Sequence, residues 1–289
     1  MAPLNGPQCH AAGDAADSAR ALDELETDLL LEALYQRFGF DFRAYERAAL
    51  LVKLKAAAAQ WQLASLSQLQ DRVLHDAAVA SAVLRALSVP AAQLFDDAQW
   101  AIDLRSVLAS CLRVSALPKV WLAECAGAEQ AWTLAILLCE QGLDQRTEIH
   151  ATLSNDAMLA EVAGAGIAME RIADCQARYA AAGGSGDLMA YFEVVDGRAV
   201  LLARLRERIT WAQYNLVTDA SFNEFQVIVC RQALAEFSAP LRSRTLRLFH
   251  DSLALFGVIG IDREFDANDA LGVCYQRVAA GKPWYKRIA

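Results

Sequence analysis

Two groups of closely spaced arginines in this sequence could bind an anionic ligand. Three arginines fall within residues 204–208, just after a predicted β-hairpin, and three fall within residues 242–247 of one predicted helix. Guanidinium groups bind phosphate oxygens well, so either group could hold a phosphate-bearing ligand such as a cyclic dinucleotide. The alternative is that both groups form ordinary solvated surface. The candidate phosphate contacts are Arg204, Arg208, Arg242 and Arg247.

The histidines and cysteines do not suggest a metal centre. The four histidines are scattered, and the seven cysteines include no Cys-x-x-Cys pair. A zinc site or a disulfide framework is therefore not expected, and buried thiols in a reducing cytoplasm are the simpler interpretation. Cys230 follows an apolar run, so we interpret it as a packed thiol rather than a nucleophile.

Composition limits the classes of protein that this chain can represent. At ~150 residues per domain, 289 residues predict about two domains, and 55% hydrophobic residues can build a sizeable core. A formal charge of −8 argues against a DNA-binding protein. No apolar stretch approaches the ~20 residues that cross a bilayer, and residues 1–20 lack the features of a secretory signal. We therefore expect a cytoplasmic protein without membrane insertion.

The elements that must position these residues fall into two regions. We expect a flexible leader over residues 1–20, a helical domain over 21–90 and a connector over 91–118. Residues 119–289 alternate strands with helices, which predicts an α/β domain with a mainly parallel sheet. Asp196-Gly197 between two β-prone runs predicts a hairpin, within an antiparallel insert of about residues 187–210.

The boundaries of these elements follow from periodicity and from breakers such as Gly39 and Pro118. The predicted helices cover about 22–38, 42–62, 67–87, 102–111, 131–141, 156–163 and 239–256. The predicted strands cover 120–123, 148–153, 191–195, 199–202, 209–214, 225–230, 257–261 and 273–277.

Several segments, taken in order, carry a family resemblance. Residues 38–45 read FGFDFRAY, residues 120–135 read VWLAECAGAEQAWTLA, and residues 225–237 read FQVIVCRQALAEF; Asn215-Leu216 lies between the last two. The chain resembles the CheR family of chemotaxis receptor methyltransferases. That resemblance implies a small helical domain, then a Rossmann-like methyltransferase domain with an inserted β-subdomain. It also implies S-adenosylmethionine as cofactor and chemoreceptor glutamates as substrate.

The departures from the family pattern fall on the residues that the resemblance assigns to the cofactor. Asp96 replaces an arginine that pairs with the cofactor's carboxylate, which turns attraction into like-charge repulsion. At the turn after the first strand, Glu124 and Ala128 replace glycines that let the backbone approach the ligand. Leu153 replaces the acid that bonds the ribose, and Asp156 is a possible displaced substitute.

The position near the reactive methyl departs as well. Glu236 stands where the family has a tyrosine, and Gln232 where it has an asparagine. The resemblance therefore implies a vestigial cofactor cleft. Its predicted lining is Asp96, Glu124, Glu129, Leu153, Asn215, Leu216 and Arg231.

Together these departures favour a non-catalytic, pseudo-methyltransferase binding or regulatory protein of bacterial chemosensory signalling, with no bound cofactor. We expect a chemoreceptor or other signalling protein to dock on the β-subdomain, and a small regulatory ligand could use the cleft. One alternative is an active methyltransferase, in which Glu129, Asn215, Leu216 and Arg231 bind S-adenosylmethionine and Arg231 and Glu236 take part in catalysis. A third is a cyclic-dinucleotide effector that uses the arginine groups.

Overall fold

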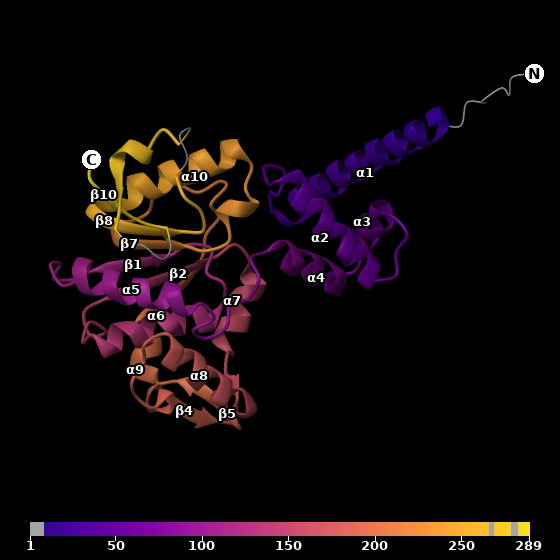
Figure 1. Ribbon diagram of the computed structural model, residues 1–289. Helices are drawn as coiled ribbons and strands as arrows, with labels where there is room; N and C mark the ends of the chain where they lie inside the picture. The colour runs from indigo at the N-terminus through magenta and orange to yellow at the C-terminus, as the bar shows by residue number, and fades with distance from the viewer. Residues whose placement is uncertain (1–8, 266–268, 279–282) are drawn as a thin grey trace, which may run out of the picture. The chain divides into compact units, whose positions relative to one another are not determined.

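The chain divides into two units between Ser88 and Val89 (Figure 1). The computed structural model describes residues 9–265, 269–278 and 283–289. The connector predicted over residues 91–118 belongs to the second unit and contains helix α5 (Ala98–Cys111). The boundary therefore falls where the helical pattern ends before Pro90, and not at a separate linker.

The first unit is built from helices around one apolar core. Leucines 30, 31 and 34 of α1 pack with residues of the other three helices, including Leu54, Leu69 and Val83. A helix that buries such a stripe gains most of its stability from this packing and little from propensity. The helices are α1 (Cys9–Phe38), α2 (Arg47–Gln60), α3 (Leu66–His75) and α4 (Ala77–Leu87).

Two predictions for this unit were wrong. The predicted leader is part of α1 from Cys9 onward; residues 1–8 of it lie outside the described residues. The single helix predicted over 67–87 is two helices, α3 and α4, separated at Asp76. Asp76 has extended backbone, and its carboxylate accepts the N–H groups of Ala78 and Val79. This N-cap starts a new helix inside a continuous apolar pattern.

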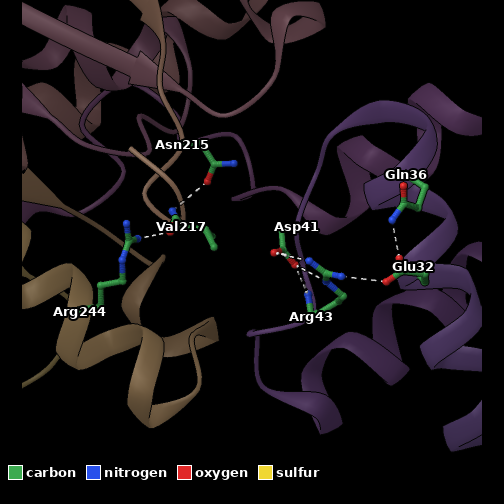
Figure 2. A network of polar contacts seen from close by, with 7 residues as sticks. All are labelled: Glu32, Gln36, Asp41, Arg43, Asn215, Val217 and Arg244. Carbon is green, nitrogen blue, oxygen red and sulfur yellow. Dashed lines mark hydrogen bonds and ion pairs between the residues drawn. The ribbon is translucent and has the colours of Figure 1, made fainter. Parts of the chain in front are cut away.

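The turn after α1 explains the residues of the FGFDFRAY segment. Gly39 ends α1 with φ +78°, and its N–H donates to the Tyr35 carbonyl at 2.8 Å. The Arg43 guanidinium then binds the Asp41 carboxylate through two bonds of 2.9 Å and Glu32 at 2.8 Å (Figure 2). Arg43 also lies 3.9 Å from the Tyr35 ring centre. These contacts hold the pKa of Asp41 below its ordinary value and fix the loop against α1.

Glu26 should be a large contributor to the stability of this unit. It is only 9% exposed, and it accepts the Leu66 N–H at 3.1 Å and the Ser67 hydroxyl at 2.6 Å. Glu26→Ala should therefore lower the free energy of unfolding by about 1–3 kcal/mol, because it leaves the buried Leu66 N–H of α3 unpaired. Urea unfolding followed by circular dichroism measures this. The matched variant of exposed Glu24, Glu24→Ala, should stay within about 0.5 kcal/mol of the parent, and an equal loss in both variants would contradict the account.

The second unit contains a seven-stranded sheet in the order β6-β2-β1-β7-β8-β10-β9. The first five strands pair in parallel, as predicted, and β10 pairs antiparallel with both β8 and β9. The strands of this sheet are β1 (Lys119–Leu122), β2 (Glu148–Leu153), β6 (Ile209–Gln213), β7 (Phe225–Cys230), β8 (Leu253–Ile261), β9 (Tyr275–Arg277) and β10 (Trp284–Arg287).

Helices cover both faces of this sheet (Figure 1). Val120 and Leu122 of β1 belong to the core formed with α5 and α6, whereas Trp121 between them packs on Phe249 of α10. This alternation is the ordinary consequence of strand geometry. The helices are α5, α6 (Ala128–Glu140), α7 (Asp156–Ala163), α8 (Ile172–Ala181), α9 (Ala203–Arg206) and α10 (Ala239–Ser252). Among the described residues, no helix is long and apolar enough to cross a membrane.

The predicted insert is a separate antiparallel sheet with the order β3-β5-β4. Its hairpin, β4 (Phe192–Val195) and β5 (Arg198–Leu201), turns at Asp196-Gly197 as predicted. It also recruits β3 (Ile167–Ala168), so the insert begins earlier than residue 187. Other details were missed. Strand β8 begins at Leu253 rather than 257, through a bulge with Phe256 at φ +67°, and α8, α9 and β10 were not predicted.

Candidate functional site

The candidate site lies where the parallel strands β1, β2 and β7 end. The loop of residues 123–127 joins β1 to α6, and its backbone is tied to both neighbouring strands. Ala123 N–H donates to the Val229 carbonyl and Cys125 N–H to the Thr152 carbonyl, each at 2.8 Å. Ligands of open α/β sheets bind outside the carboxyl ends of the strands, so this edge is the place to examine.

Glu124 occupies the turn that follows β1. Its backbone has φ +48°, a conformation that favours glycine, and its side chain is buried with only 7% of the residue exposed. Burial raises the pKa of its carboxyl to about 7, the charge of Glu236 adds to this rise, and a hydrogen bond with Ser154 opposes it. The Glu124 carboxyl is therefore buried at the ends of the strands and does not lie in solvent.

Asp96 and Arg231 form an ion pair at the same edge, with 3.0 Å between Oδ1 and Nη1. The Arg231 guanidinium also lies 4.6 Å from the Trp100 ring centre, and its side chain is 14% exposed. Two residues that were both predicted to line the cleft are thus paired with each other. These residues are 135 positions apart, and the sequence predicted both as site residues without predicting their pairing.

Glu129, on the first turn of α6, holds two other segments. Its Oε1 and Oε2 accept from Arg171 at 2.8 and 3.0 Å, and Oε2 also accepts the Leu94 N–H at 2.7 Å. Thr133, one turn later, accepts the Phe95 N–H at 3.1 Å. Arg171 was missed by sequence reasoning, because nothing in its local pattern marks it. Glu129 therefore fixes the segment that carries Asp96.

The remaining predicted cleft residues lie on strand ends and on the loop after β6. Leu153 is fully buried in the core, where it provides no side-chain acceptor. The Asn215 carbonyl Oδ1 accepts the Val217 N–H at 2.8 Å, and Arg244 donates to the Leu216 carbonyl at 2.9 Å and to that of Val217 (Figure 2). These contacts shape the loop. The side chain of Asp156, the possible ribose acid, lies outside the described side chains.

Cys230 and Glu236 flank the end of β7. Cys230 is completely buried, and burial raises the pKa of its thiol well above the ordinary value, which fits a packed thiol better than a nucleophile. Glu236 ends a short 3₁₀ turn, Leu234–Glu236, close enough for its charge to raise the pKa of Glu124. The candidate site therefore gathers four carboxyl groups of the predicted set, those of Asp96, Glu124, Glu129 and Glu236, and one predicted arginine, Arg231.

The structure does not bring the two arginine groups together, since one lies around α9 and the other on α10 (Figure 1). The Arg204 guanidinium lies 3.1 Å from the Asp144 carboxylate and 3.5 Å from Cys139 Sγ. Arg242 donates to the Phe237 carbonyl at 2.8 Å. Arg208 is half-buried before β6, and Arg247 is exposed on α10. Several of these guanidinium groups thus bind protein groups.

Comparison with known proteins identifies the family. The model of the CheR methyltransferase SAM-binding domain matches residues 96–264, and that of the CheR all-alpha domain matches residues 25–88. The chain therefore belongs to the CheR methyltransferase family, with an N-terminal all-alpha domain and a methyltransferase α/β domain, as the sequence predicted.

Individual relatives agree with this assignment. The chain is 34% identical over 236 residues to the putative methyltransferase Cher3 of Pseudomonas putida, covering 82% of this chain and 86% of that protein. It is 21% identical over 244 residues to a chemotaxis protein methyltransferase of Listeria innocua, covering 83% and 90%. Among solved structures, the N-methyltransferase NodS of Bradyrhizobium japonicum with S-adenosyl-L-homocysteine aligns with TM-score 0.36 and 10% identity, covering 68% of this chain and 88% of that one.

Proposed function

We propose that this chain is a non-catalytic member of the CheR family that has lost S-adenosylmethionine binding and acts by binding a partner protein or a regulatory ligand. The observation that carries the proposal is the ion pair between Asp96 and Arg231. The family resemblance implies an arginine at position 96 that pairs with the cofactor's carboxylate. Here the cofactor's carboxylate would lose that arginine partner and would meet instead an Asp96 carboxylate that is bound to Arg231.

The other residues of the edge support the same conclusion. Glu124 places a buried carboxyl at the turn where the resemblance implies a glycine and a closely approaching ligand. Leu153 offers the ribose hydroxyls no acceptor, and both oxygens of Glu129 are already held by Arg171 and Leu94. The residues present therefore do not fit the carboxylate and the ribose of S-adenosylmethionine.

A methyl-transfer assay separates this proposal from an active enzyme. The full chain is incubated with methyl-labelled S-adenosylmethionine and chemoreceptor cytoplasmic domains, the substrate class that the family resemblance implies. We expect no incorporation above the level without protein. Incorporation that is lost in Glu129→Ala but kept in the matched variant of exposed Glu170, Glu170→Ala, would overturn the proposal in favour of the enzyme that uses Glu129, Asn215, Leu216 and Arg231.

We further propose the β-subdomain as the partner surface. Strand β4 lies at the edge of its sheet, and its Val194 and Val195 are 57% and 45% exposed. An exposed edge strand can accept an added strand from a partner peptide. Replacing both valines by aspartate should weaken capture of a chemoreceptor cytoplasmic domain at least ~10-fold, a loss of about 1.4 kcal/mol. Val52→Asp, at an exposed valine of α2, should not weaken it; equal effects would count against this surface.

A further inference from the structure

A cavity of about 680 Å³ lies in the α/β unit away from the strand ends. One wall is a face of α5, a second is the end of α6, and a third is the loop after α8. Its lining includes Ile102, Arg105, Ser106, Ala109, Glu140, Gln141, Tyr179 and Tyr191, with the loop residues Gly183, Ser185 and Gly186. Helix α6 has 13 residues, so it separates this cavity from the turn at Glu124 by about 20 Å.

Arg105 is the fixed cation of this cavity. Its Nε and Nη2 donate to Glu140 Oε2 at 3.3 and 2.7 Å, and its Nη1 donates to the Ala182 carbonyl. Glu140 Oε1 in turn accepts the Tyr179 hydroxyl at 2.5 Å. These bonds use three of the five N–H groups of the guanidinium, and the Arg105 side chain as a whole is 25% exposed. The remaining donors are held in place and are available to an anionic oxygen.

Gln141 supplies an acceptor beside that cation. Its Nε2 donates to the Arg105 carbonyl at 2.6 Å, which orients the amide. Its Oε1 is buried and has no hydrogen-bond partner. Buried side-chain acceptors without a partner are uncommon in folded proteins. Beside the cavity, the spare donors of Arg105 are therefore accompanied by a buried Gln141 oxygen that has no partner.

The glycine-rich loop is shaped by these side chains. Gly183 has φ +84°, and a Cβ there would lie 3.1 Å from Arg105 Nη1. At Gly184 a Cβ would lie 2.3 Å from the Tyr179 ring. The loop backbone thus packs directly on the two side chains that bind Glu140. A larger residue at Gly183 or Gly184 would displace these side chains, so this part of the loop serves as a wall of the cavity.

We propose that this cavity binds a small carboxylate with a neighbouring N–H donor, of which a free α-amino acid is the simplest case. The carboxylate binds the spare N–H groups of Arg105, and the amine donates to Gln141 Oε1. The side chain lies against Ile102, Ala109 and Tyr191. Because Arg105 and Glu140 already balance each other, the site suits a zwitterion without net charge.

Saturation-transfer NMR of the full chain with each of the twenty amino acids at millimolar concentration tests this. We expect at least one to bind, its methyl ester to bind at least ~10-fold more weakly, and Arg105→Lys to weaken it similarly. Arg113→Lys, at an exposed arginine just after α5, should leave binding unchanged. An N-acetylated derivative that binds equally well identifies the end of a peptide chain as the source of the same chemistry.

Ser106→Trp is a second variant that tests the proposal even if Arg105→Lys does not fold. Ser106 is exposed on the α5 wall, so the indole should fill the cavity and abolish binding while the melting temperature stays near that of the parent. Binding of none of the amino acids, equal binding of acid and ester, or unchanged binding by Ser106→Trp would each overturn the proposal. None of these results depends on whether the strand-end site binds S-adenosylmethionine.

Discussion

Glu124→Gln should stabilise the α/β unit by about 2–3 kcal/mol at pH 8 and by little at pH 4.5. Burial raises the pKa of Glu124 to about 7 from its ordinary value of 4.5. Between these values the unfolded chain loses the proton that the folded chain keeps, so the stability of the parent falls as pH rises through this range. A shift of this size corresponds to about 3 kcal/mol when complete. Glutamine has nearly the same shape and carries no charge, so the stability of the variant should not fall as pH rises through this range.

Urea unfolding at several pH values, followed by tryptophan fluorescence, measures the difference. All the tryptophans except Trp61 belong to the α/β unit, so the signal reports mainly on that unit. The control is Glu207→Gln, which removes an exposed carboxylate and should follow the parent at every pH. If Glu124→Gln also follows the parent from pH 4.5 to pH 8, Glu124 is not a buried acid at this turn.

Trp121→Ala should have the largest effect on stability, a loss of about 3–5 kcal/mol. Trp121 is fully buried on β1, and its ring centre lies 5.2–5.4 Å from those of Tyr214, Phe222, Phe225 and Phe249. Its Nε1 donates to Thr152 Oγ1 at 2.9 Å. The substitution therefore opens a cavity beneath the candidate site and removes a buried donor. Thermal and urea unfolding of the full chain measure the loss.

A graded series tests the reason for that loss. Trp121→Phe keeps an aromatic ring in the cluster, so it should cost clearly less than Trp121→Ala. Val114→Ala, at a side chain that is 87% exposed, should stay within about 0.5 kcal/mol of the parent. Equal losses for Trp121→Phe and Trp121→Ala would show that the hydrogen bond to Thr152, and not the packing, carries the effect.

The core strands could be predicted from sequence because each is a short apolar run bounded by breakers. Residues 149–153 and 225–230 are buried or half-buried on both faces, as such runs predict for parallel strands. The helix boundary at Asp76 was not predicted, because the apolar pattern continues through it. Strand β10 was not predicted, because the burial of its Trp284 depends on residues far away in the sequence. Trp284 stacks on Trp100 and lies against Gly260.

The candidate site was predictable as a set of positions and not as a set of contacts. The family resemblance placed Asp96 and Arg231 at one site, but a pairing across 135 residues has no local signal. The ion pair between Arg171 and Glu129 has no local signal either, because the two residues are 42 positions apart. Burial of Glu124 depends on how three strand ends converge, and only the folded chain shows it.

Calorimetric titration of the purified full chain with S-adenosylhomocysteine tests the central claim most directly. The product carries the same carboxylate and ribose as the cofactor, so it meets the Asp96–Arg231 pair, Glu124 and Leu153 in the same way. The account predicts no binding heat at millimolar product. A dissociation constant in the micromolar range corresponds to about −8 kcal/mol of binding free energy. It would show that other contacts make up for the unfavourable effect of these residues on binding, and it would contradict the account.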